Sequence, residues 1–151
     1  MNATANAASI SQTRYNARAR EGVNLDWRII ITVAIGGGLG AALRASVGQW
    51  IAQAWPSQFP LATFTVNFSG SILIGLITGL FMYRGDVDPS IKLFLITGLL
   101  GGFTTFSSFS LEAFRLLQEG KSALALSYVF ASVVFCISGA AAGFWLARNF
   151  N

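Results

Sequence analysis

The segment from Gly98 to Ser110, with the sequence GLLGGFTTFSSFS, contains the residue types that could line a path for an ion. Its glycine pair, Gly101 and Gly102, gives a helix a place to unwind, and its threonines and serines supply hydroxyl groups. A helix broken inside a membrane releases carbonyl groups, which bind hard cations, and amide groups, which bind anions. The segment therefore predicts a broken helix beside an ion pathway, with a simple glycine kink as the alternative.

Two aromatic residues in this segment, Phe106 and Phe109, lie three positions apart and share one face if the segment is helical. Aromatic side chains in an apolar span normally fill the core or face lipid. The alternative is that the electropositive ring edges face a small, hard anion while the rings keep out water and larger solutes.

Polar residues in two other apolar stretches could belong to the same pathway. Asn67 lies within FTVNFSGS, where its amide needs a partner, and a hydrogen bond between helices is the plainer interpretation of this residue alone. Tyr128, Ser132 and Cys136 are spaced by four, which aligns two hydroxyls and a thiol on one helix face. Such hydroxyls commonly bond to their own helix instead, so the stripe is a hypothesis.

The elements that must position these residues are four apolar stretches, near 28–50, 61–83, 91–111 and 123–147. Hydrophobic residues form 54% of the chain and charged residues only 11%, whereas soluble domains carry about 25% charged residues. Continuous apolar runs of about 20 residues predict helices that cross a bilayer, not the alternating strands of a barrel. Small residues at four-residue spacing predict close helix packing; they are Gly36 and Gly40, Ser71, Gly75 and Gly79, and Gly139 and Gly143.

We therefore predict an all-α integral membrane protein of four transmembrane helices, broken in the third, with one domain over 26–151. Residues 1–25 are polar, and we expect a disordered tail there. The net charge of +4 comes from scattered basic residues, so we expect lipid contacts and no nucleic-acid partner. The chain holds one cysteine and no histidine, which excludes an internal disulfide and most hydrolytic enzymes.

The charges at the span ends are almost balanced between the two sides. Outside the tail, one side carries Arg28, Arg84, Lys92 and Arg148, and the other carries Arg44, Arg115 and Lys121. Basic residues normally mark the cytoplasmic side, so this weak bias raises the hypothesis of dual topology, in which two oppositely oriented copies pair. The arginines of the tail would tilt the count toward an amino terminus on the inside.

Three motifs in order are similar to one family: GGGLGAALR at 36–44, TFTVNFSGSILIG at 63–75, and GLLGGFTTFSSFSLE at 98–112. Over nearly all of the chain after the tail, the sequence resembles the Fluc or CrcB fluoride channels of bacteria and the related eukaryotic exporters. The resemblance implies a dual-topology antiparallel homodimer with two pores, which exports cytoplasmic fluoride passively across the bacterial inner membrane, and a structural sodium ion at the dimer centre.

The resemblance also implies roles for individual residues. The fluoride pathway would comprise Asn67, the Phe106 and Phe109 box with Ser108 between them, and the track of Tyr128 and Ser132. Sodium would be held by the main-chain carbonyl groups of Gly101 and Thr104. Arg44 would attract anions to a vestibule by its charge, or serve only as an interfacial anchor. Cys136 departs from the family, because it stands where a further hydroxyl would extend the track.

Two other classes of protein compete with a channel. A small multidrug-resistance-like, proton-coupled exporter needs a membrane-embedded carboxylate, whereas Glu112 is expected at the end of the third span, paired with Arg115. A structural membrane subunit would explain the glycines but not the polar residues in the spans. An enzyme is not expected, since no metal cluster, activated nucleophile or phosphate loop is found in the sequence.

Overall fold

The computed structural model describes residues 26–83, 85 and 87–150. The predicted tail over 1–25 lies outside these residues. The chain divides into two units, 1–30 and 31–151, and of the first unit only the residues that begin helix α2 are described. The helix packing and the candidate site both lie within the second unit.

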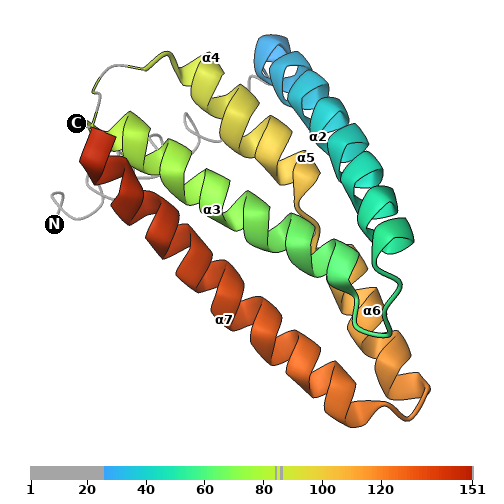
Figure 1. The fold of residues 1–151 in the computed structure, drawn as a ribbon. Helices are drawn as coiled ribbons and strands as arrows, with labels where there is room; N and C mark the ends of the chain where they lie inside the picture. Colours follow the sequence, from blue (N-terminus) through green and yellow to red (C-terminus); the bar gives the residue numbers. More distant parts are fainter. Residues whose placement is uncertain (1–25, 84, 86, 151) are drawn as a thin grey trace, which may run out of the picture. The chain divides into compact units, whose positions relative to one another are not determined.

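The described residues form helices and connecting loops without a strand (Figure 1). In chain order the elements are α2 (Trp27–Ala54), α3 (Leu61–Tyr83), α4 (Pro89–Lys92), the π-helix η1 (Leu93–Leu100), α5 (Gly101–Phe103), α6 (Phe106–Gln118), α7 (Ser122–Ala147) and the 3₁₀-helix η2 (Arg148–Phe150). Within the described residues, four segments are long and apolar enough to cross a membrane: Trp27–Ala54, Leu61–Tyr83, Pro89–Gln118 and Ser122–Ala147. The prediction of an all-α protein with four membrane-spanning segments is confirmed.

Helices α3 and α7 run parallel and side by side because glycines remove the side chains between them (Figure 1). A Cβ atom added to Gly143 of α7 would collide with the carbonyl oxygen of Ile72, and one added to Gly75 of α3 would collide with that of Ala140. Helix backbones this close gain van der Waals contact, which is a main source of helix association in lipid.

Helix α2 packs on the third segment by the same device. A Cβ on Gly36 would lie 2.7 Å from the carbonyl oxygen of Phe94. A Cβ on Gly102 would lie 2.8 Å from the Cα of Gly37 and collide with its carbonyl oxygen. The glycines at these positions therefore serve close contact between the two segments.

The third segment is interrupted, as predicted, but not at its glycine pair. Gly101 and Gly102 are helical, and the chain becomes extended at Thr104 (φ −81°, ψ 159°) and Thr105 (φ −151°, ψ 118°) before α6 begins. The preceding turns of η1 are a π-helix, a rare form that is often found near functional sites. The break therefore lies at the two threonines.

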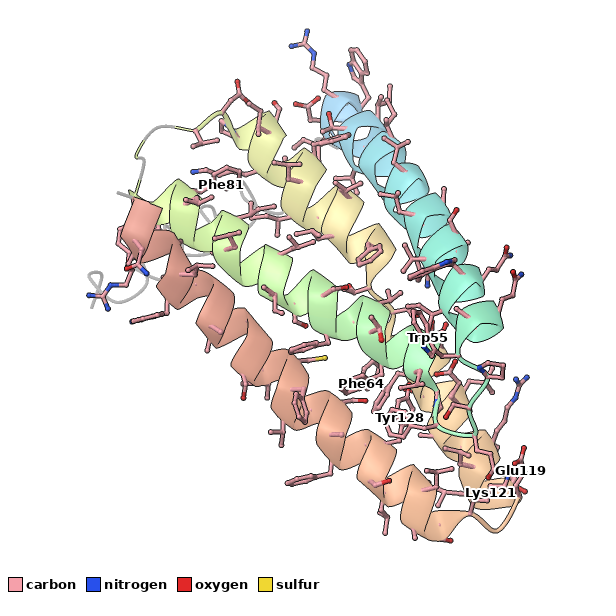
Figure 2. The ribbon with its side chains drawn as sticks, in the orientation of Figure 1. Trp55, Phe64, Phe81, Glu119, Lys121 and Tyr128 are labelled. Atoms are coloured by element: carbon pink, nitrogen blue, oxygen red, sulfur yellow. The ribbon has the colours of Figure 1, made fainter. Side chains whose placement is uncertain are left out.

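A small apolar core lies where α6 and α7 meet beside α3, and Figure 2 labels its member Tyr128 and also Phe64 of α3, which packs against it. Its buried residues are Ala113, Leu116, Ala125 and Tyr128. Elsewhere the helices expose large apolar side chains; on α7, for example, Phe130 is 73% exposed and Ile137 is 67% exposed. Such surfaces fit lipid or another membrane helix.

Candidate functional site

The side chain of Asn67 on α3 holds the break in the third segment. Its Oδ1 accepts a hydrogen bond from the Thr105 amide at 2.8 Å, and its Nδ2 donates to the Thr105 carbonyl oxygen at 3.0 Å. In a continuous helix the Thr105 amide would instead donate to the Gly101 carbonyl. Asn67 therefore replaces the helical partners of Thr105, and one Nδ2 hydrogen remains for another acceptor.

Thr105 also begins helix α6. Its Oγ1 accepts a hydrogen bond from the Ser108 amide at 3.2 Å, which is the usual N-cap arrangement. The same oxygen lies 3.2 Å from Ser107 Oγ and 3.2 Å from Ser108 Oγ. These contacts gather the hydroxyl groups of the segment at the N-terminus of α6, where the positive end of the helix dipole favours an anion.

A groove of about 330 Å³ lies beside the break, between α3, α6 and α7. Four of the predicted pathway residues line it: Asn67, Phe106, Phe109 and Ser132. Its walls also include the two threonines of the break and Cys136. The structure thus brings together most of the polar and aromatic residues that the sequence singled out, from segments far apart in the chain.

Ser132 differs from three other short hydroxyls of the spans. Ser71 donates to its own helix at Asn67 O (2.8 Å), and Ser110 and Thr104 do the same at Phe106 O (2.9 Å) and Leu100 O (2.9 Å), respectively. Ser132 is only 6% exposed, and its Oγ has no hydrogen-bond partner among the described residues. A buried hydroxyl without a partner costs free energy, which a bound ligand in the groove would recover.

The aromatic residues of the site form a row. The ring centroids of Phe106 and Phe109 are 5.4 Å apart, and those of Phe109 and Tyr128 are 5.2 Å apart. Phe106 is 79% exposed at the groove, whereas Tyr128 is fully buried and does not line it. Tyr128 therefore lies behind Phe109, and its pathway role stays a prediction.

Glu112 is a residue of this site whose position differs from the sequence prediction. Its Oε1 accepts a hydrogen bond from Thr63 Oγ1 at 2.8 Å, and its Oε2 accepts one from Tyr128 OH at 2.8 Å. The expected pairing with Arg115 is not formed, and the third segment continues to Gln118, beyond Glu112. The hydroxyl groups of Thr63 and Tyr128 could have indicated partners for Glu112, but both residues lie too far from Glu112 in the sequence for spacing to reveal the contact.

A second groove, also of about 330 Å³, lies between α2, α3 and α6. Arg44 and Glu112 line it together with Ser108 and Thr105, although Arg44 and Glu112 form no ion pair. Ser108, predicted in the pathway, thus faces this groove and not the one that holds Phe106. Thr105 lines both grooves, so the break separates them.

The break offers main-chain carbonyl oxygens as possible ligands for a cation. Because the chain is extended at Thr104 and Thr105, the Thr105 amide does not donate to the Gly101 carbonyl. Helix α6 begins at the next residue, Phe106. In the described part of the chain no three residues among His, Cys, Asp and Glu lie together as metal ligands. The chemistry of the released carbonyls fits a hard cation such as sodium.

The four apolar segments, the broken third helix and its polar groove define a small multi-pass membrane protein with a candidate ion pathway. Residues 31–144 match the family model described as CrcB-like protein, Camphor Resistance (CrcB). The chain belongs to this family.

Relatives over most of the chain are named as ion channels. The chain is 48% identical to the fluoride-specific ion channel FluC of Methylobacterium sp. (strain 4-46), over 80% of this chain and 97% of the relative. It is 46% identical to the FluC of Stutzerimonas stutzeri (strain A1501), over 80% and 98% of the two chains. These relatives are named as ion channels, which are not enzymes, so the prediction that the protein is not an enzyme is confirmed.

Proposed function

We propose that the protein is a fluoride-selective channel through which cytoplasmic fluoride leaves the cell passively. The observation that carries the proposal is the groove at the break. Asn67 and Ser132, whose hydroxyl has no partner among the described residues, line this groove together with two phenylalanines. Relatives that align over nearly their whole length bear the name fluoride-specific ion channel.

The donors in this groove suit a compact anion. Fluoride loses much hydration free energy on entering an apolar site unless donors replace its water. Asn67 has one amide hydrogen free to donate, and the Ser132 hydroxyl is also free to donate. Phe106 and Phe109 can turn their electropositive ring edges to the ion. None of these groups carries a fixed positive charge, so the ion is bound weakly enough to leave.

Fluoride would pass the break between the two grooves. Arg44 on the second groove raises the local concentration of anions there. The Ser108 hydroxyl, which accepts from Thr105 Oγ1, continues the line of donors at the N-terminus of α6. Tyr128 is linked to the second groove because its hydroxyl donates to Glu112, which lines that groove.

The functional assembly in this proposal is an antiparallel homodimer of dual topology with two pores. With the tail set aside, the nearly balanced basic residues at the span ends give either orientation little advantage. The first groove and the exposed Phe106 beside it are open on one side, which a second copy would cover.

A sodium ion at the dimer centre would be held by the Gly101 and Thr104 carbonyls. When bound, it supplies a fixed positive charge near the anion path and stabilises the broken segment. The chain itself contributes the extended break at Thr104 and Thr105, which leaves the Gly101 carbonyl without its helical amide partner.

We place the protein in the inner membrane of a bacterium, where it would lower fluoride toxicity. Expression in a bacterium that lacks its own fluoride exporter tests this. Growth in fluoride should be rescued by the wild-type protein and not by Asn67→Asp, with both proteins present in the membrane in equal amounts. Failure of the wild-type protein to rescue growth would contradict the proposal.

A further inference from the structure

Cys136 offers a thiol to the groove of the proposed pathway. It is the only cysteine of the chain, it is partly exposed, and it lines the groove one helical turn beyond Ser132 on α7. The spacing of four places Cys Sγ and Ser Oγ on one helix face. The buried Ser132 hydroxyl has no partner among the described residues, so the groove presents a soft ligand with an unused polar group beside it.

The number and softness of the metal-binding side chains in the groove determine which cation can bind there. Thiols select soft cations over hard ones. Zinc takes three or four protein ligands, whereas no cluster of three metal-ligating side chains occurs in the described residues. A soft cation with linear coordination, such as mercury(II) or silver(I), needs one protein thiolate and takes its other ligand from solution.

The apolar walls of the groove favour one form of such a cation. Ile74, Val133 and Phe106 line the same groove as the thiol. A hydrated ion would lose its water there at high cost, whereas neutral mercuric chloride enters without a charge.

We propose that this groove is a binding site for soft, linearly coordinated metal cations, with Cys136 as the covalent ligand, and that the bound metal blocks anion passage. The blocking step rests on the proposed fluoride pathway. With mercuric chloride, the Sγ–H bond breaks and its proton goes to water, an Sγ–Hg bond forms, and one Hg–Cl bond breaks to release chloride. No atom changes its oxidation state.

The test uses the full-length protein in liposomes loaded with fluoride and treated with mercuric chloride. Each protein's efflux after treatment is divided by its own efflux before treatment. We expect wild type to lose most of its efflux and to regain it with dithiothreitol, and Cys136→Ser to keep its own efflux. Equal inhibition of Cys136→Ser would overturn the proposal, because no thiol remains in that variant.

A matched control moves the single thiol along α7. Cys136→Ser combined with Ser138→Cys places it at an exposed position that does not line the groove. This variant should bind mercury and keep its efflux; inhibition equal to that of wild type would show that the groove is not the site of block.

Mass spectrometry of the treated protein separates this proposal from the proposed function. One bound mercury on wild type and none on Cys136→Ser supports the site even if the protein conducts no fluoride before treatment, which would refute the channel alone. Absence of mercury on wild type would refute the site, and bound mercury with unchanged efflux would refute the block.

Discussion

The side-chain amide of Asn67 and the main chain of Thr105 exchange two hydrogen bonds across 38 positions of sequence. This pairing lets the third membrane segment break without leaving the Thr105 amide and carbonyl unpaired in an apolar region, where each unpaired group would cost several kcal/mol. It also fixes the Asn67 amide at the edge of the groove.

Replacing Asn67 by Asp tests this relationship. The substitution removes the Nδ2 donor, sets a carboxylate oxygen against the Thr105 carbonyl and places negative charge in the anion path. We expect fluoride efflux to be lost and the free energy of unfolding to fall by about 1–3 kcal/mol. Efflux from liposomes and unfolding in detergent measure the two effects.

Ser69→Ala is the matched control for this change. Ser69 lies on the same helix, does not line the groove and donates to its own helix at Thr65 O (2.7 Å). It should keep its efflux; loss of efflux in Ser69→Ala, or normal efflux in Asn67→Asp, would contradict the assignment.

Phe106→Ile removes an aromatic edge from the groove and keeps an apolar side chain. Because Phe106 is 79% exposed, its replacement removes little core packing, and we expect weaker fluoride efflux from a folded protein. Phe114→Ile on the same helix is the control, since Phe114 is 55% exposed and lines neither groove. Equal efflux from both variants would remove Phe106 from the pathway.

Tyr128→Phe breaks the hydrogen bond to Glu112 while leaving the ring between Phe59 and Phe109. A hydrogen bond to a charged group contributes about 1.5–3 kcal/mol, so the free energy of unfolding should fall by about that amount. A double-mutant cycle with Glu112→Gln measures the pair directly. Additive effects of the two substitutions would show that the bond contributes nothing to stability.

Gly143→Ala tests the close packing of α3 and α7. Its Cβ would collide with the Ile72 carbonyl, which cannot swing away as a side chain could, and overpacking of this kind costs about 1–3 kcal/mol. Gly38→Ala is the control, since its Cβ would meet nothing within 4 Å, and alanine stabilises a helix by up to about 1 kcal/mol over glycine. Equal stability changes in detergent would refute the packing role.

The sequence predicted the four spans well because each is a long apolar run. It misplaced the break: glycines suggested unwinding at Gly101 and Gly102, but both residues are helical, and α2 packs closely against Gly102. The break falls at Thr105, where Asn67 supplies the alternative hydrogen bonds. A partner 38 positions away leaves no local signal.

The candidate site was predictable in its residue types and less so in its contacts. Asn67, Phe106, Phe109 and Ser132 were found from polarity and spacing and do meet at one groove. The burial of Tyr128 and its bond to Glu112 depend on how α6 and α7 fold back on each other, which periodicity does not encode.

Fluoride and chloride efflux from liposomes, with and without a proton gradient, tests the central claim most directly. A passive selective channel predicts rapid fluoride loss, little chloride loss and no dependence on the proton gradient. Glu112 lies within the third segment, so a proton-coupled exporter has a carboxylate available. Fluoride loss that requires the proton gradient, or no fluoride loss from folded protein, would contradict the account.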